Sequence, residues 1–181
     1  MQKFCIFLLK LLGWNYELSV EIPDKTVICV APHTSNMDYI IGIIFYKAAI
    51  GSTPHVLMKK ELFLFPFSRL FKSMGGIPVD RKKKTSVSDQ MVELFNSEKR
   101  FRLAVAPEGT RQRTGQWKTG FYYIAMNANV PITLAYIDYS KKEVGVKKVF
   151  SPTGDYQSDI EEIKNYYKDV RAKYPGKFAI K

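Results

Sequence analysis

The fold is decided by one stretch of the chain, residues 26–38, which reads TVICVAPHTSNMD. Its first six residues form an almost continuous apolar run, which is typical of a β-strand that is covered on both faces. The residues that follow are mostly polar, and Ser35 or Asn36 can cap a helix at its N-terminus. The stretch therefore predicts a strand over residues 26–31, a turn, and a helix over residues 36–50.

The same alternation of short apolar runs and helix-like stretches continues along the chain. Further strands are expected at residues 55–58, 76–79, 102–106, 131–137 and 144–150, and further helices at residues 61–74, 86–96, 118–127 and 158–173. This order predicts an α/β fold with a mixed, mainly parallel sheet flanked by helices, and an antiparallel pair late in the chain. No repeat or linker divides the chain, so we expect an N-terminal apolar helix in residues 1–18 and one domain over residues 19–181.

Composition and charge narrow the range of functions. Hydrophobic residues make up 46% of the 181 residues, and 12 Phe and 11 Tyr supply apolar surface for one substantial core, which excludes disorder as the main state. The 28 Lys and Arg exceed the 17 Asp and Glu, so the net charge is +11. We therefore expect anionic partners, which can be nucleic acid, phosphorylated metabolites or acidic lipid.

Several classes of catalytic site find no support in the sequence. The chain has no G-x-S-x-G elbow and no glycine-rich phosphate loop. Its two cysteines, Cys5 and Cys29, and its two histidines, His33 and His55, form neither a disulfide framework nor a metal-ligand pattern. We therefore expect no metal and no cofactor, and a base that acts directly on a substrate hydroxyl remains.

His33 is the candidate for that base. If His33 lies in the turn and Asp38 in the first turn of the helix, the carboxylate can orient the imidazole and raise the basicity of its other nitrogen. The spacing Ser35-x-x-Asp38 also fits a helix capping box, which needs no catalysis. Both interpretations remain open at this point.

Basic and polar residues follow three other expected strands. Lys59 and Lys60 end the second strand, residues 80–84 (Asp, Arg and three Lys) follow the third, and residues 107–111 (PEGTR) follow the fourth. Each group alone is consistent with a plain turn or with solvated charges. Because the ends of parallel strands lie at one edge of a sheet, together they indicate an anion pocket that faces the histidine.

Read together, these stretches resemble the motifs of the glycerolipid acyltransferase family, whose best-known members are the lysophosphatidic acid acyltransferases. Residues 33–38 resemble its H-x-x-x-x-D motif, residues 76–81 its G-x-x-x-x-D-R motif, and residues 107–111 its P-E-G-T-R motif. Residues 130–132 (VPI) are similar to a fourth, apolar motif. Four motifs in the family's order make the resemblance specific, and it covers residues 26–137.

The resemblance implies an O-acyltransferase of phospholipid biosynthesis. His33 would remove the proton of an acceptor hydroxyl, Asp38 would support it, and the hydroxyl would attack the thioester of acyl-CoA or acyl-carrier protein, which is a donor substrate. The acceptor would be a lysophospholipid such as lysophosphatidic acid. The resemblance implies that its polar head contacts Lys59, Arg81, Glu108, Gly109, Thr110 and Arg111.

A lipid substrate implies contact with a membrane. Residues 1–14 combine Lys3 and Lys10 with apolar side chains and fit a short interfacial helix. Residues 62–67 (LFLFPF), followed by Arg69 and Lys72, form a second apolar and basic patch. Either segment can instead pack into the core. With the surplus of positive charge, we expect an anionic membrane surface as partner and a peripheral position at the cytoplasmic face of the cell membrane.

Two alternatives stay open. Pro32 and the pair Pro78–Val79 depart from the residues most members of the family carry, so the acceptor can also be an amino-acid-containing lysolipid. A non-catalytic basic module that binds acidic membranes would explain the charge but not the pairing of His33 with Asp38. Nucleic acid is not expected as a partner, because the basic residues lie in separate loops and no recognition motif occurs.

Overall fold

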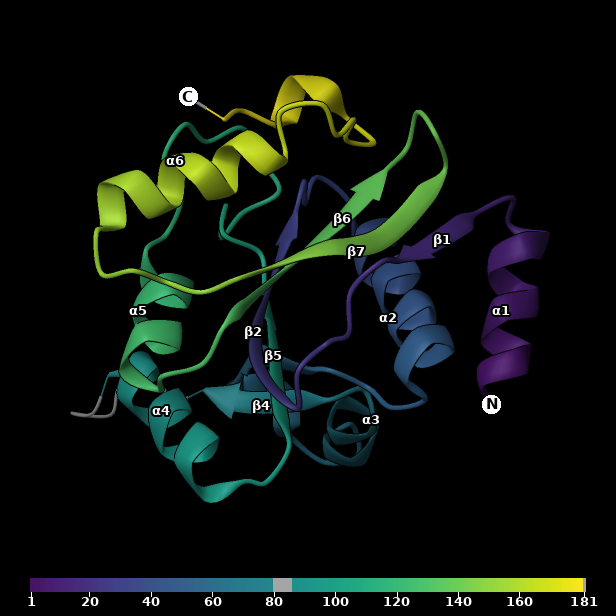
Figure 1. Ribbon diagram of the computed structural model, residues 1–181. Helices are drawn as coiled ribbons and strands as arrows, with labels where there is room; N and C mark the ends of the chain where they lie inside the picture. Colours follow the sequence, from purple (N-terminus) through teal and green to yellow (C-terminus); the bar gives the residue numbers. More distant parts are fainter. Residues whose placement is uncertain (80–85, 181) are drawn as a thin grey trace.

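The computed structural model describes residues 1–79 and 86–180, and Figure 1 shows a twisted sheet with helices on both faces. In these residues the sheet has seven strands in the order β1-β7-β6-β2-β5-β3-β4. Neighbouring strands are parallel except for β6 and β7, so the predicted fold class is confirmed. The strands are β1 (Asn15–Leu18), β2 (Lys25–Ala31), β3 (His55–Lys59), β4 (Gly76–Val79), β5 (Phe101–Val105), β6 (Ile132–Asp138) and β7 (Glu143–Phe150).

The helices form a layer on each side of the sheet (Figure 1). One layer contains α1 (Gln2–Leu11) and α2 (Asn36–Ile50), and the other contains α4 (Val87–Ser97), α5 (Gly120–Asn127) and α6 (Tyr156–Tyr166). Three short elements complete the fold: η1 (Lys60–Phe63), α3 (Ser68–Ser73) and η2 (Pro175–Lys177). Within the described residues, no helix combines the length and the apolar character needed to cross a bilayer.

The central strand β2 separates two hydrophobic cores. Val27 and Cys29 belong to the core on the side of α4, α5 and α6, whereas Ile28 belongs to the core on the side of α1 and α2. This alternation is that of a strand covered on both faces, as the apolar run predicts. Because a shift of one residue would exchange the two faces, burial fixes the register of β2. It also fixes which residues leave the sheet at its carboxyl end.

The single helix expected over residues 61–74 is wrong. The chain forms the short helix η1, a connection that starts in extended backbone at Leu64, and then α3. Pro66 lies in this break. Its ring removes a backbone donor and disfavours helical backbone at the preceding residue, Phe65, so one continuous helix cannot form.

Two further differences lie near the chain ends. The last helix ends at Tyr166, earlier than expected. The residues after it pack against the β6–β7 connection, where the N–H of Tyr139 donates to Arg171 O at 2.9 Å. Residues 15–18 form an edge strand, β1, that pairs with β7 and that the sequence analysis did not predict. The boundary at residue 18 stays a prediction.

The order of the strands brings three loops to one place. β2 pairs with β5 on one side and with β6 on the other, all in parallel. The segments that follow β2, β5 and β6 therefore emerge side by side at the carboxyl edge of the sheet, where α/β folds build their sites. The carboxyl end of β2 is thus the structural centre of the candidate site.

Candidate active site

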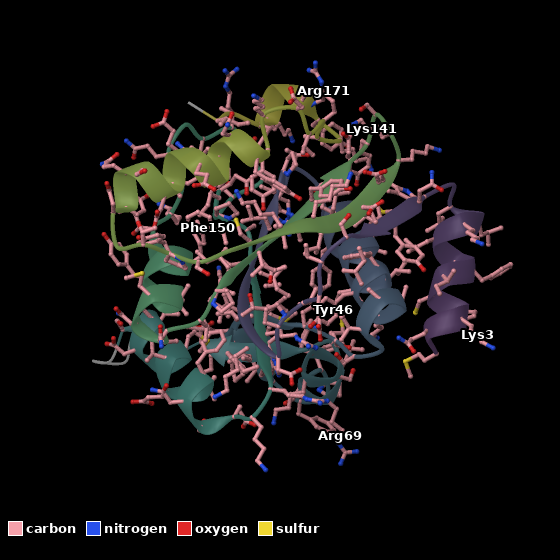
Figure 2. The ribbon with its side chains drawn as sticks, in the orientation of Figure 1. Lys3, Tyr46, Arg69, Lys141, Phe150 and Arg171 are labelled. Atoms are coloured by element: carbon pink, nitrogen blue, oxygen red, sulfur yellow. The ribbon has the colours of Figure 1, made fainter. Side chains whose placement is uncertain are left out.

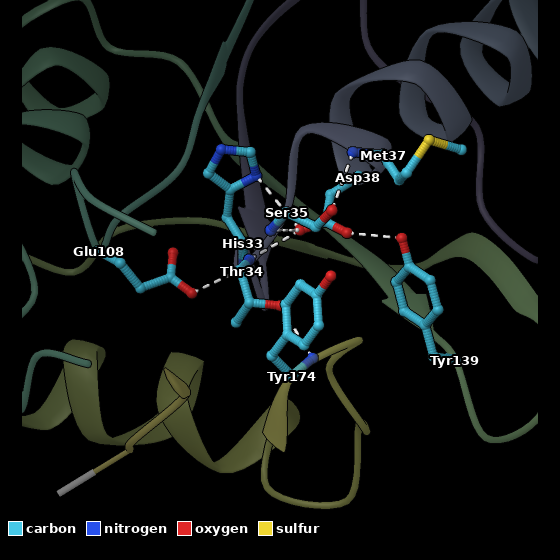
Figure 3. Close-up of polar contacts among 8 residues, drawn as sticks. All are labelled: His33, Thr34, Ser35, Met37, Asp38, Glu108, Tyr139 and Tyr174. Carbon is cyan, nitrogen blue, oxygen red and sulfur yellow. Dashed lines mark hydrogen bonds and ion pairs between the residues drawn. The ribbon is translucent and has the colours of Figure 1, made fainter. Parts of the chain in front are cut away.

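The turn after β2 is shaped by the carboxylate of Asp38. Asp38 Oδ2 accepts the backbone N–H groups of Thr34 at 2.7 Å and Ser35 at 2.8 Å, and Ser35 Oγ accepts the N–H of Met37 at 3.1 Å (Figure 3). These contacts form the predicted capping box at the start of α2. The same oxygen of Asp38 lies 3.6 Å from His33 Nδ1. The capping interpretation and the pairing interpretation are therefore both consistent with the structure, because the Asp38 carboxylate caps the helix and also faces His33.

A third donor reaches Asp38 from β6. Tyr139, the residue after β6, donates its hydroxyl to Asp38 Oδ1 at 2.7 Å (Figure 3). Burial, and then the hydrogen bond to Asp38, raise the pKa of Tyr139 well above its usual value, so the phenol stays protonated as a donor. The Asp38 side chain is almost fully buried and is held by three donors. Its position relative to His33 is therefore fixed from two strands.

His33 has the electrostatic properties of a neutral base. Its side chain is 20% exposed, and burial lowers the pKa of the imidazole below 6.5. The positive charge of Arg111 lowers it further, while Asp38 raises it and only partly offsets these effects. At neutral pH the ring is therefore uncharged. With Nδ1 facing Asp38, Nε2 is the nitrogen that can take a proton.

Glu108 fixes the backbone of His33 from the other side. It follows β5, its side chain is buried, and its Oε1 accepts the N–H of His33 at 2.9 Å. Glu108 Oε2 is also buried, and within the described residues it has no hydrogen-bond partner. Burial raises the pKa of Glu108 to about 7. Glu108 therefore contacts the loop that carries His33, whereas its expected contact with substrate stays a prediction.

A polar cavity of about 530 Å³ lies beside His33. Gly109 adopts a left-handed backbone with φ of +62°, which favours glycine, and Thr110 and Arg111 follow on the exposed side of the loop. Hydroxyl, guanidinium and backbone donors at such a position suit a phosphate or another anionic head. The residues that line this cavity are His33, Ala106, Gly109, Thr110, Arg111 and Gln112.

A second, apolar cavity of about 560 Å³ also begins at His33. It extends between the sheet and α2 towards α3, and its volume lies within the range of about 300–1,000 Å³ found for small-molecule pockets. His33, Gly109 and Arg111 line both cavities. Farther from His33, the lining includes Gly42, Ile43, Val56, Met58, Phe71 and Met74.

The predicted site residues divide into three groups. His33, Asp38, Glu108, Gly109, Thr110 and Arg111 come together at the carboxyl edge of the sheet. Lys59 lies at the exposed end of β3 and is not among the lining residues of either cavity. Arg81, with its neighbours in residues 80–85, lies outside the described residues.

Two residues of the site were missed by the sequence analysis. Tyr139 follows a buried strand, which is the same positional signal that selected the other loops. Gly42 lies within α2 and lines the apolar cavity, where a larger side chain would occupy the space. An isolated glycine in an apolar helix is the available signal for such a position, because glycine weakens helices and needs a packing reason.

We expect Glu108→Gln to change how stability depends on pH. A carboxyl whose pKa rises from 4.5 to about 7 on folding destabilises the folded state once it ionises, so the wild type loses stability as pH rises through this window. The variant lacks this loss. The difference in free energy of unfolding, variant minus wild type, should therefore be about 3 kcal/mol larger at pH 8 than at pH 4, measured by urea unfolding. Parallel pH profiles of the two proteins would contradict the burial of an ionisable Glu108.

The chain is similar to known proteins over most of its length. The family model described as Acyltransferase matches residues 15–137, which is more than half of the chain. A 1-acyl-sn-glycerol-3-phosphate acyltransferase from Cocos nucifera is 26% identical over 171 residues, which cover 85% of this chain and 54% of that protein. A probable 1-acyl-sn-glycerol-3-phosphate acyltransferase from Mycoplasma genitalium is 32% identical over 146 residues, 70% of this chain and 53% of that protein. The chain thus spans about half the length of these curated relatives.

A solved structure shares the fold. The crystal structure of the 1-acyl-sn-glycerophosphate (LPA) acyltransferase PlsC from Thermotoga maritima superposes with a TM-score of 0.62 and 18% sequence identity. The superposition covers 91% of this chain and 74% of that one. The range matched by the family model contains the turn after β2, the loop after β5 and the strands that place them. The resemblance indicated by the motifs is therefore confirmed, and the chain belongs to the acyltransferase family.

Proposed function

We propose that the protein transfers a fatty acyl group from a thioester donor to the hydroxyl of a lysophospholipid such as lysophosphatidic acid. The observation that carries this proposal is that a polar cavity and an apolar cavity meet at one neutral imidazole, His33. An acyl transfer to a lysolipid needs these three parts: a place for a charged head, a place for an acyl chain, and a base between them. The names of the relatives support the same reaction.

The reaction follows from the position of His33. The phosphate of the acceptor binds near Thr110 and Arg111, and the acyl chain of the donor lies in the apolar cavity. His33 Nε2 takes the hydroxyl proton while the hydroxyl oxygen forms a bond to the thioester carbonyl carbon. The tetrahedral intermediate then breaks its C–S bond, and the thiolate leaves with the proton returned by His33. No acyl-enzyme forms.

Charge supports each step. The carboxylate of Asp38, 3.6 Å from Nδ1, stabilises the imidazolium that forms when His33 takes the proton. Arg111 opposes that positive charge in the free protein. A bound phosphate neutralises Arg111, so acceptor binding raises the basicity of His33 when the base is needed. Tyr139 and Glu108 act at a distance from the reacting atoms by holding Asp38 and the His33 backbone.

The donor is acyl-carrier protein or acyl-CoA, both of which present an acyl thioester on an anionic carrier. Neither acts as a cofactor, because the acyl group is consumed in each turnover. The net charge of +11 and the exposed cation of Arg111 beside His33 suit either donor. Lys59 and Arg81 remain proposed contacts of the anionic substrates.

The enzyme acts at the cytoplasmic face of the cell membrane as a peripheral protein. Helix α1 packs on α2 through Cys5 and Leu9, which are buried, while Phe4, Phe7 and Leu11 are exposed. An apolar exposed helix face with Lys3 and Lys10 beside it suits the interface of a membrane with anionic lipid.

The test of the proposed function is a mass-spectrometric transfer assay on the purified chain. The donors are acyl-CoA and acyl-carrier protein, and the acceptors are lysophosphatidic acid, other lysophospholipids and an amino-acid-containing lysolipid in detergent micelles. Acylated lysophosphatidic acid is the expected product. Product from the amino-acid-containing lysolipid alone would replace the acceptor, and no product from any pair would contradict the proposal.

His33→Ala should lower kcat about 10²–10⁴-fold, the range expected for loss of a general base. The fold should remain, because the side chain is partly exposed and Asp38 keeps its bonds to the turn. The matched control is His55→Gln, since His55 stacks on Phe101 and lies outside the cavity linings. Equal rates for His33→Ala and the control, in proteins with the same circular dichroism, would remove His33 from the mechanism.

The pH dependence of kcat/KM should show an acid limb below pH 6.5, because the base must be neutral and burial lowers the pKa of His33. Activity should therefore rise with pH through this limb. In Arg111→Gln the limb should move to higher pH, since loss of the nearby cation raises the pKa of His33. A limb that stays in place or moves to lower pH would show that Arg111 does not act on the base.

A further inference from the structure

Large apolar side chains are exposed mainly in two segments of the described chain. One is α1, and the other is the η1–α3 segment, which we define as residues 60–73. In the η1–α3 segment Phe65 is 96% exposed and Leu64 is 68% exposed. Leu62, Phe67 and Leu70 are also exposed. A contiguous apolar patch of this kind marks an interaction site, because isolated soluble domains rarely present one.

The η1–α3 segment is an ordered part of the fold with one inward and one outward side. The rings of Phe63 and Phe71 lie 5.9 Å apart and are both partly buried, and Phe67 N–H donates to Leu64 O at 2.9 Å. The carbonyl of Met74, directly after α3, accepts the hydroxyl of Tyr39 from α2 at 3.3 Å. These contacts hold the segment against the domain while Leu64 and Phe65 face outward.

The inward side of the segment lines the apolar cavity. Leu62 from the segment, Phe71 from α3 and Met74 after it are among the lining residues of the cavity that begins at His33. Leu62 is itself exposed, and the exposed Leu64 and Phe65 lie two and three residues after it in the chain. The exposed apolar surface is thus continuous with the wall of the cavity.

The charge around the patch indicates what covers it. Lys59, Arg69 and Lys72 are exposed beside it, and no ion pair of these three occurs in the part of the chain that the structure describes. Glu61 is the acidic residue of the segment. Exposed aromatic and aliphatic side chains flanked by Lys and Arg fit the interface of an anionic bilayer.

The start of α1 and the end of the η1–α3 segment both lie near residues 51–54, which follow α2. The Gln2 side chain lies against Gly51, at the end of α2, while Gly75, after α3, lies against the carbonyl of Pro54. Residues 51–54 therefore join the two exposed apolar regions. In Figure 2, Lys3 of α1 and Arg69 of α3 lie along the right-hand and lower margins of the molecule.

We propose that the η1–α3 segment is a membrane-insertion element that seats the wall of the apolar cavity formed by Leu62 and Phe71 on an anionic leaflet. Leu64, Phe65 and Phe67 enter the lipid, and the basic residues beside them contact the head groups. The bilayer presents the acceptor at this surface, and the acyl chain transferred from the cavity passes with the product into the bilayer along Leu62 and Phe71 without crossing water. Only this last step rests on the proposed function, because binding to a bilayer needs no catalysis.

The first test is sedimentation of the full chain with vesicles of phosphatidylcholine and phosphatidylglycerol, compared with phosphatidylcholine alone. Phe65→Ser should weaken binding to the anionic vesicles about tenfold, because it removes one fully exposed aromatic ring from the interface. The matched control is Tyr123→Ser, since Tyr123 is an exposed aromatic residue of α5, which lies on the other face of the sheet from α1 and α2. If Phe65→Ser binds the anionic vesicles as tightly as the wild type does, the proposal is overturned, because α1 alone would then make the membrane contact.

The second test locates the segment in the bilayer directly. The native Trp14 and Trp117 are buried in the protein, so we expect vesicles to leave their fluorescence unchanged. A change in fluorescence on adding vesicles then comes from the tryptophan placed at position 65. Fluorescence of Phe65→Trp should shift to shorter wavelength and be quenched by brominated phospholipids, whereas Tyr123→Trp should not respond. Absence of quenching in Phe65→Trp, or concentration-dependent self-association that Phe65→Ser abolishes, would show that the patch meets water or protein rather than lipid.

Activity separates this proposal from the proposed function. Neither Leu64 nor Phe65 lines a cavity, so Phe65→Ser should match the wild type with water-soluble, short-chain substrates and fall below it with vesicle-bound acceptor. If Phe65→Trp inserts into the bilayer while the wild type transfers no acyl group to any acceptor, the proposed function is contradicted and the insertion element stands. Equal losses with soluble and vesicle-bound acceptor would contradict a role of the segment in access from the bilayer.

Discussion

The carboxylate of Asp38 is the constraint on which the site depends. It closes the turn after β2 by accepting two backbone N–H groups, it receives the Tyr139 hydroxyl from β6, and it faces His33 Nδ1. A helix cap and a catalytic partner are usually considered separate roles. Here the same buried group starts α2 and faces the imidazole, so the start of the helix and the orientation of the proposed base are set together.

The parallel sheet supplies the rest of the arrangement. Because β5 and β6 flank β2, the buried carboxylate of Glu108 and the hydroxyl of Tyr139 reach the turn of His33 from opposite sides. The loop after β5 then places a polar cavity on one side of the imidazole, while the space between α2 and the sheet provides an apolar one. A charged head and a hydrocarbon chain can thus approach one base from different compartments. This division is what makes acyl transfer to a lysolipid the function the geometry supports best.

The sequence predicts local features better than contacts between distant segments. The helix over residues 36–50 begins and ends where expected, because Ser35 caps it and Gly51 ends it in left-handed backbone. The sequence alone also predicts the capping box and the loop positions of His33, Glu108 and Arg111. The bonds from Glu108 to His33 and from Tyr139 to Asp38 join residues 75 and 101 positions apart, so only the strand order creates them. The apolar cavity likewise depends on how α2 packs, and no local pattern encodes its volume.

The claim that the acyl chain occupies the apolar cavity is tested most directly by chain-length selectivity. Gly42 lines the cavity, and a β-carbon there would lie 3.9 Å from Ile137, an ordinary contact that leaves the backbone undisturbed. The measurement is kcat/KM for palmitoyl and octanoyl donors with the wild type, Gly42→Ala and Gly42→Leu. The account predicts that the palmitoyl rate falls relative to the octanoyl rate, slightly for Gly42→Ala and strongly for Gly42→Leu. An unchanged ratio in both variants would contradict it, because the chain would then lie elsewhere.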